Sequence, residues 1–154
     1  MDNTIENNAI KYGLLTSFAL IGFFFLMKVM GLSTEYELRA LNVLFLFSGV
    51  YFAVKSYIDK ADNVNYLGGL GTGMLTSGIA LFVFSGFIVI YLGVIDPSFM
   101  NSLKEYEYFG RYLNPYIAGA VIFLEGTISG LLVSFILMQY YKRSHLSTTE
   151  PAIP

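Results

Sequence analysis

The chain contains no cysteine and no tryptophan, and its single histidine, His145, lies in the last ten residues. Without cysteine it can form no disulfide, no thiolate metal site, no iron–sulfur cluster and no cysteine nucleophile. Haem in a membrane is usually held by histidine, and no apolar stretch of this sequence contains one. We therefore expect no cofactor.

Charge is scarce as well. Asp, Glu, Lys and Arg make up 13% of the 154 residues, and 9 basic against 11 acidic residues leave a net charge of −2. This balance does not point to nucleic-acid binding. Apolar residues reach 55%, and the charges leave several runs of about 20 residues almost free of them. The composition argues against a soluble enzyme, a disordered linker or a coiled coil, and is typical of a multi-pass membrane protein.

Four apolar stretches are long enough to cross a bilayer, at about residues 10–32, 35–58, 69–95 and 116–141. As a helix, the first would be roughly 34 Å long. It follows a polar, acidic segment over residues 1–9, whereas a secretory signal would begin with basic residues and have a shorter apolar core. We interpret it as a retained first helix. The polar tail over residues 142–154 is predicted to be disordered.

Local signals mark where these helices begin. Thr34 and Glu37 have the spacing of a capping box, and Glu35 can pair with Arg39 one turn later, which predicts the start of the second helix. The pairs Asp96-Pro97 and Asn114-Pro115 each place a capping residue before a proline. Because proline suits the first helical position, both pairs predict helix starts.

The segment 97–113 is too charged to span a membrane. Its apolar residues fall on one stripe, and its charged residues lie off it; the stripe consists of Phe99, Leu103, Tyr106 and Leu113. We predict a short amphipathic helix lying at the membrane interface, with an ordinary polar loop as the alternative.

The predicted fold is therefore all-α, a bundle of four transmembrane helices with this interfacial helix between the third and fourth. Four spans place both termini on one side. That side would carry five basic residues against four on the other, a small bias that predicts both termini in the cytoplasm. The two sets are Lys11, Lys55, Lys60, Lys142 and Arg143, against Lys28, Arg39, Lys104 and Arg111.

Several stretches resemble a known family. They are Lys55 to Asp59 with the glycine-rich run Gly68 to Gly73, the third-span exit Tyr91 to Met100, and the last span with Gly126 to Gly130 and a basic end. Together they resemble the domain-of-unknown-function 4199 family of small four-helix bacterial membrane proteins, over roughly residues 10–143. The resemblance implies four spans and a bacterial inner membrane. It implies no activity and no catalytic residues.

Glu125 is the residue most able to carry function. It lies about ten residues into the fourth span, roughly 14 Å below the outer edge and close to mid-bilayer. A carboxylate at this depth is costly and marks a pathway or a paired polar site. Two interpretations stay open: a relay group for protons or cations, or a neutral acid that hydrogen-bonds neighbouring helices.

Depth along the spans predicts the neighbours of Glu125. Ser48 and Ser85 are expected at similar depth on the second and third spans, and Ser129 lies one turn away on the same helix. Lys28 lies about 6 Å below the outer end of the first span. Its long side chain can reach toward Glu125 or toward the lipid headgroups, and we favour the headgroups.

Small residues form a second pattern on the third and fourth spans, where they recur every four positions. The two stripes are Gly69, Gly73 and Ser77, and Gly126, Gly130 and Ser134. Such stripes let helix backbones approach closely in lipid. We predict contacts within the chain, with a seam between copies as the alternative.

Two function hypotheses follow. The sequence lacks the metalloprotease and serine-hydrolase motifs, and its spans offer mainly Glu125, Lys28, Asn42 and scattered hydroxyls, so we expect no enzyme. The first hypothesis is a non-catalytic scaffold, assembly factor or accessory subunit of a membrane complex. The second is a small oligomeric transporter or channel that uses Glu125 for proton or cation coupling. The expected partners are the lipid bilayer and either other membrane proteins or further copies of this chain, with no nucleic acid.

Overall fold

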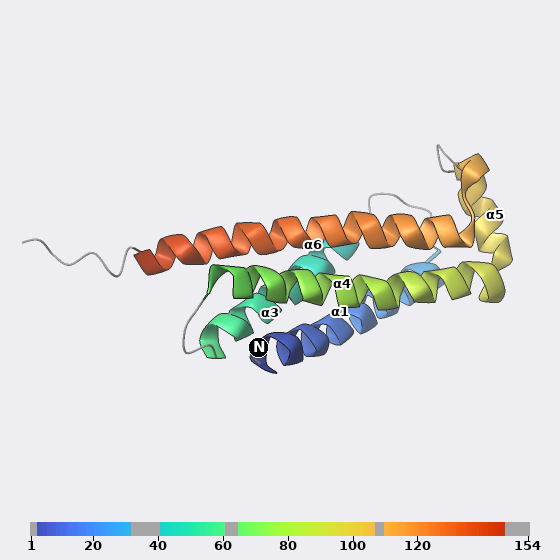
Figure 1. Ribbon diagram of the computed structural model, residues 1–154. Helices are drawn as coiled ribbons and strands as arrows, with labels where there is room; N and C mark the ends of the chain where they lie inside the picture. The colour runs from blue at the N-terminus through green and yellow to red at the C-terminus, as the bar shows by residue number, and fades with distance from the viewer. Residues whose placement is uncertain (1–2, 32–40, 61–64, 107–109, 147–154) are drawn as a thin grey trace, which may run out of the picture.

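The computed structural model describes residues 3–31, 41–60, 65–106 and 110–146. These ranges are almost entirely helical and contain no strand, so the predicted all-α class is confirmed. Five α-helices form the fold (Figure 1): α1 (Asn3–Val29), α3 (Leu41–Lys60), α4 (Tyr66–Ile90), α5 (Pro97–Tyr106) and α6 (Pro115–Leu146). A π-helical turn, η1 (Tyr91–Ile95), follows α4, and a 3-10 turn, η2 (Gly110–Tyr112), precedes α6.

Four of these helical segments are long and apolar enough to cross a membrane. They cover Ile5–Val29, Leu41–Lys60, Tyr66–Ile95 and Pro115–Tyr141. Each overlaps one of the four predicted spans, so the chain is a multi-pass membrane protein.

The helix ends differ from prediction at both termini. α1 begins at Asn3, inside the segment 1–9 that was expected to be a polar extension. Glu6 lies in its first turn, where an acidic side chain interacts favourably with the positive end of the helix. α6 continues to Leu146, into the tail expected to be disordered from residue 142, because extending an existing helix costs far less than starting one. The predicted capping box at Thr34 lies outside the described residues, as do the Glu35–Arg39 pair and residues 147–154.

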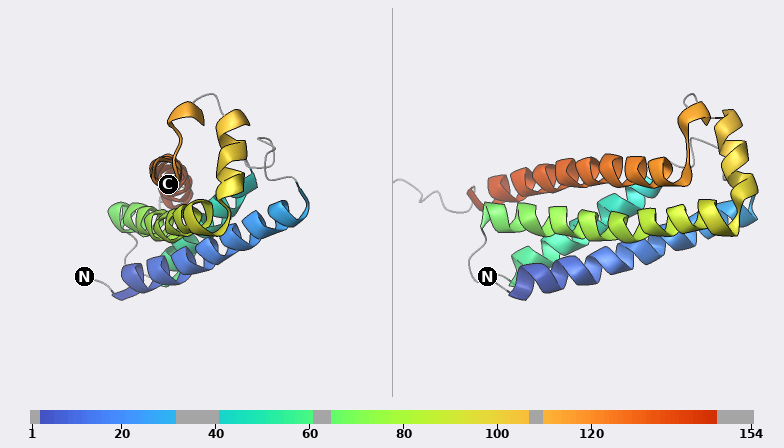
Figure 2. Two further views of the ribbon diagram at one scale, coloured as in Figure 1. Left: turned by 90° about the vertical axis from the view of Figure 1, so that its right-hand side faces the viewer. Right: turned by 45° about the vertical axis from the view of Figure 1, so that its right-hand side comes forward.

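The interfacial segment is shorter than predicted. α5 ends at Tyr106, and residues 110–112 form the separate turn η2. Figure 2 shows α5 lying across one end of the bundle. Met100 and Leu103 are buried there, and Phe99 packs against the core. The apolar side of α5 therefore covers the bundle end instead of facing away from the protein.

α4 is the central helix. It packs against α1, α3 and α6, while α3 also contacts α1 and α6. Facing residues show that α4 and α6 run antiparallel, because Gly69 meets Met138 and Gly119 meets Val89. Both the start of α1 and the end of α6 lie at the end opposite α5 (Figure 1). We call these two ends the terminal end and the α5 end.

Candidate functional site

The two stripes of small residues face each other along α4 and α6, toward the terminal end. A Cβ added at Gly73 would overlap Ser134, and one added at Gly130 would overlap Ser77. Gly69 lies against Met138, and a Cβ at Gly126 would come within 2.6 Å of Leu81. We call this contact the seam. Within the described chain, the seam uses both stripes to pack one helix of the protein against another.

The seam has its hydrogen bonds satisfied locally. Ser77 Oγ donates to the carbonyl of Met74 at 3.0 Å, and Ser134 Oγ donates to the carbonyl of Gly130 at 2.8 Å. Ser77 and Ser134 are fully buried. These hydroxyls are bound within their own helices, so the seam is a structural contact with little chemistry to offer.

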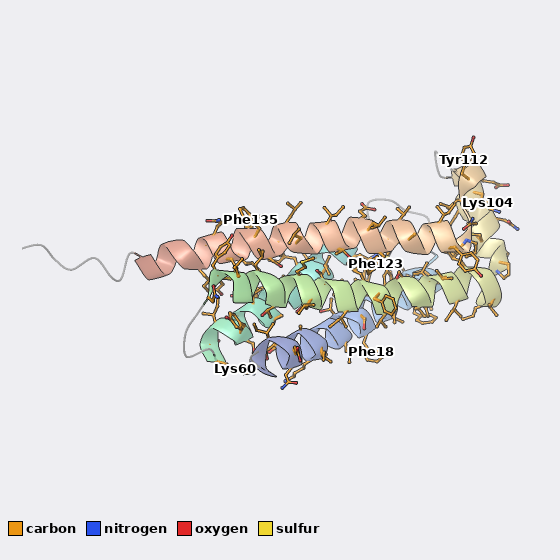
Figure 3. The ribbon with its side chains drawn as sticks, viewed as in Figure 1. Phe18, Lys60, Lys104, Tyr112, Phe123 and Phe135 are labelled. Atoms are coloured by element: carbon orange, nitrogen blue, oxygen red, sulfur yellow. The ribbon has the colours of Figure 1, made fainter. Side chains whose placement is uncertain are left out.

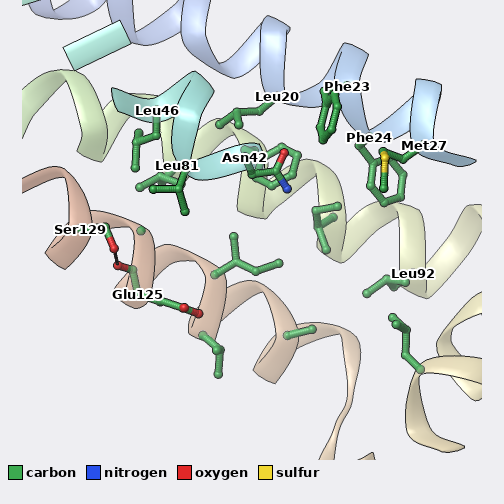
Figure 4. A pocket seen from close by; sticks show the side chains of 18 of the residues that line it. Leu20, Phe23, Phe24, Met27, Asn42, Leu46, Leu81, Leu92, Glu125 and Ser129 are labelled. Atoms are coloured by element: carbon green, nitrogen blue, oxygen red, sulfur yellow. Dashed lines mark hydrogen bonds between the residues drawn. The ribbon is translucent and has the colours of Figure 1, made fainter. Parts of the chain in front are cut away.

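A cavity of about 630 Å³ lies toward the α5 end, between α1, α3, α4 and α6 (Figure 4). Its walls are mostly apolar and aromatic side chains, among them Leu20, Phe24, Leu46 and Phe84. Phe99 and Leu103 of α5 also line it. The volume falls in the range of about 300–1,000 Å³ that is typical of small-molecule sites.

Three polar side chains line this cavity: Asn42 on α3, and Glu125 and Ser129 on α6. Figure 4 shows Glu125 and Asn42 on opposite walls. Ser129 Oγ donates to the backbone carbonyl of Glu125 at 2.9 Å, so its oxygen still has a free lone pair. The structure thus sets a carboxylate, an amide and a hydroxyl among apolar side chains.

Of the four residues expected near Glu125, the cavity brings in Ser129 alone. Ser48 is exposed on α3 and donates to the carbonyl of Leu44 at 2.9 Å. Ser85 is buried on α4 and donates to the carbonyl of Phe82 at 3.2 Å. Neither serine lines the cavity.

Lys28 pairs with a residue other than Glu125. It forms an ion pair with Asp96, which follows η1. The Nζ atom also lies over two aromatic rings, 4.0 Å from the centroid of Phe99 and 5.1 Å from that of Tyr91. In the described residues this is the only ion pair. Lys28 thus does not reach Glu125 but pairs with Asp96, while a contact with lipid headgroups stays a prediction.

Asp96 also caps α5, as the Asp-Pro pair predicts. Its Oδ1 accepts hydrogen bonds from the backbone N–H of Phe99 at 3.0 Å and from Ser98 Oγ at 2.5 Å. The hydrogen bond from Lys28, followed by those from Ser98 and Phe99, holds the pKa of the Asp96 carboxyl far below its usual range. Lys28 therefore joins α1 to the start of the helix that covers the cavity.

Asn42 is the site residue that sequence reasoning did not assign. Its Oδ1 atom is buried and has no hydrogen-bond partner among the described residues. A polar residue within an apolar stretch was visible in the sequence. Its place on a cavity wall was not, because that depends on how α3 is rotated against its neighbours.

The sequence comparisons agree with the resemblance found above. A model of the family described as protein of unknown function, DUF4199, matches residues 11–143. No curated protein and no solved structure matches the chain. The site must therefore be interpreted from its own geometry.

Proposed function

Because the chain belongs to the DUF4199 family, for which no activity is established, we propose its function from the cavity. The proposed role is that of a non-catalytic membrane protein, which binds a small amphiphilic molecule at the Glu125 cavity and transports it within the bilayer. The observation that supports this proposal is the cavity of about 630 Å³ with a carboxylate in an apolar wall. Apolar walls with a few placed polar groups are the usual form of a small-molecule site.

Binding fits this site better than catalysis does. Enzymes that transfer protons or groups place at least two reactive side chains within hydrogen-bond reach of one substrate. The cavity offers one carboxylate, one amide and one hydroxyl, and the hydroxyl is bonded to its own helix. The described residues also hold no group of three potential metal ligands. We therefore propose that the bound molecule leaves chemically unchanged.

The proposal refines the transporter hypothesis more than the accessory-subunit one. The accessory-subunit hypothesis drew on small-residue stripes that would be free to bind another protein. In the structure these stripes pack against the facing helix at the seam, between α4 and α6. A role as a subunit of a larger complex stays a prediction, and it needs another surface than this one.

We also propose that the protein lies in a bacterial inner membrane with both termini in the cytoplasm. The family resemblance and the small excess of basic residues at the terminal end support this location. The chain lacks cysteine, so single-cysteine variants can test it. Lys104 on α5 and Lys60 on α3 lie at opposite ends of the bundle (Figure 3). A membrane-impermeant maleimide added to intact spheroplasts should label Lys104→Cys and spare Lys60→Cys. The reverse labelling pattern would mean that the protein has the opposite orientation.

The binding proposal can be tested by photolabelling in phosphatidylcholine nanodiscs. The probe is dodecanol that carries a diazirine close to its hydroxyl group. Labelled residues are mapped by mass spectrometry, and we expect them on α3 and α6 around Asn42 and Glu125. Val121→Trp should fill the cavity and suppress this labelling, because Val121 lines it.

Ile128→Trp is the matched control. Ile128 lies on the same helix, is 59% exposed and does not line the cavity, so labelling should persist in this variant. An equal loss of cavity labelling in both variants would contradict the proposed function. Labelling spread evenly along the outer faces of the helices would contradict it as well.

A further inference from the structure

We propose that the molecule bound at the Glu125 cavity is a cationic amphiphile, an apolar chain ending in a protonated amine. This inference rests on the proposed function and names the chemical class of its ligand. It follows from the charge, the hydrogen-bonding character and the shape of the cavity wall.

The first argument is charge. Glu125 lines the cavity without forming an ion pair to any described residue. Lys28, the one basic residue within the described part of α1 near the α5 end, is paired with Asp96. Although the Glu125 side chain is exposed in the structure, a carboxylate near mid-bilayer is costly when it has no partner. A ligand that brings a positive charge supplies that partner.

The second argument is the kind of polar atom that the wall presents. The Glu125 carboxylate accepts hydrogen bonds, and Ser129 Oγ, which donates its proton to the Glu125 backbone carbonyl, can accept another. A protonated primary amine has three N–H donors and no acceptor. Its donors match these two acceptors on α6, whereas an anionic headgroup would meet them with acceptors of its own.

The third argument separates an organic cation from a metal ion. Hard metal ions such as Ca²⁺ and Mg²⁺ need about six oxygen ligands. The cavity offers few oxygens, and its walls include the aromatic side chains of Phe23 and Phe24. Aromatic faces attract organic ammonium groups. The protein already uses this contact once, where Lys28 Nζ lies 4.0 Å from the ring centroid of Phe99.

The fourth argument is position. Glu125, Gly126 and Ser129 are the residues of the α6 wall that lie farthest from α5, and Glu125 is roughly 15 Å along the helix from Pro115. Toward α5 the cavity is lined by apolar residues such as Leu92, Leu103 and Leu113. The ammonium group therefore lies at Glu125, and the apolar chain extends toward α5.

The test uses two photolabelling probes of equal chain length, diazirine-bearing dodecylamine and diazirine-bearing dodecanol, in phosphatidylcholine nanodiscs at pH 7. In the full-length protein we expect the amine to label the cavity residues at lower concentration than the alcohol. Glu125→Gln should raise the half-saturating amine concentration at least about tenfold, the size expected for one lost charge-assisted hydrogen bond. The same variant should leave alcohol labelling unchanged.

Glu105→Gln is the matched control, since Glu105 is an exposed acid on α5 that does not line the cavity. It should leave labelling by both probes unchanged. If both probes label the cavity equally and Glu125→Gln changes neither, the cavity binds amphiphiles but the amine class is wrong. Stronger labelling by diazirine-bearing dodecanoic acid than by the amine would also overturn the inference. If no probe labels the cavity, the proposed function itself fails.

Discussion

The seam and the cavity both use α4 and α6, and the contact between Gly126 and Leu81 borders both, yet the two regions are packed differently. At the seam, glycine and serine let the helix backbones touch, and each hydroxyl is bonded within its own helix. At the cavity, the large side chains of Leu81, Phe84 and Ile88 line a space that the neighbouring helices do not fill.

The difference shows how one bundle can combine a rigid part with a binding part. In lipid the hydrophobic effect contributes little to helix association, so the helices are held together by close backbone contact instead. With the terminal end held in this way, the α5 end can keep a cavity and an unpaired carboxylate. Buried side-chain atoms without a hydrogen-bond partner among the described residues occur at both ends, Asn42 Oδ1 beside the cavity and Asn8 Nδ2 near the start of α1, so the unpaired Glu125 carboxylate is what sets the α5 end apart.

The largest predicted effect comes from breaking the seam. Gly130→Leu places its side chain where Ser77 lies, so α4 and α6 cannot approach. We expect the free energy of unfolding to fall by roughly 3 kcal/mol or more, measured by denaturation in mild detergent. Gly78→Leu is the control, because a Cβ at Gly78 meets nothing within 4 Å. Equal stability of the two variants would show that the seam does not hold the bundle together.

The next effect concerns the ion pair between Lys28 on α1 and Asp96 at the start of α5, which we call the anchor. Lys28→Met and Asp96→Asn each remove the ion pair, and asparagine still caps α5. Each should lower Tm by several degrees, and the double variant should lower it no further than the larger single change. Fully additive losses would mean that the two side chains stabilise the protein independently. Asp96→Ala should lower Tm more than Asp96→Asn, since it also removes the cap.

A smaller and opposite effect is expected on the cavity wall. Asn42→Leu replaces a buried acceptor that has no described partner with an apolar group of similar size. The free energy of unfolding should rise by about 1 kcal/mol, because no desolvated acceptor remains. Asn101→Leu, at an exposed position of α5, should leave the free energy of unfolding unchanged; a destabilised Asn42→Leu variant would place Asn42 in a structural network instead.

The smallest effect is the pH dependence of the anchor. The Asp96 pKa is lower in the folded protein than in the unfolded chain, so its charged form stabilises the fold above the unfolded pKa of about 3.9. That stabilisation is lost as the pH falls below this value toward the folded pKa. The Tm difference between wild type and Asp96→Asn should be constant from pH 7 to pH 5 and shrink below about pH 4. A difference that stays unchanged down to pH 2 would contradict the assigned ion pair.

Sequence reasoning predicted the spans well because each depends only on a long apolar run. The helix starts at Pro97 and Pro115 were also predictable, since Asp96 and Asn114 cap them through local hydrogen bonds. The repeats of small residues predicted two faces for close packing. They could not show that Gly73 faces Ser134, because register between helices depends on the whole interface.

The site was less predictable, for a related reason. Lys28 and Asp96 lie 68 residues apart in sequence, and their pairing depends on how α1 packs beside the exit of α4. The role of Asn42 depends on the rotation of α3. Whether a cavity remains depends on how the side chains of several helices fill the space between them. The residue pattern of a single helix therefore cannot predict it.

The most direct test of the account is a crystal structure of the full-length protein grown in a lipid phase with dodecylamine. The account predicts that the seam stays closed and that an elongated density fills the cavity, with its amine within hydrogen-bond distance of the Glu125 carboxylate. A structure in which α3 closes against α6, so that Leu46 and Ile122 fill the space and no density lies beside Glu125, would contradict it.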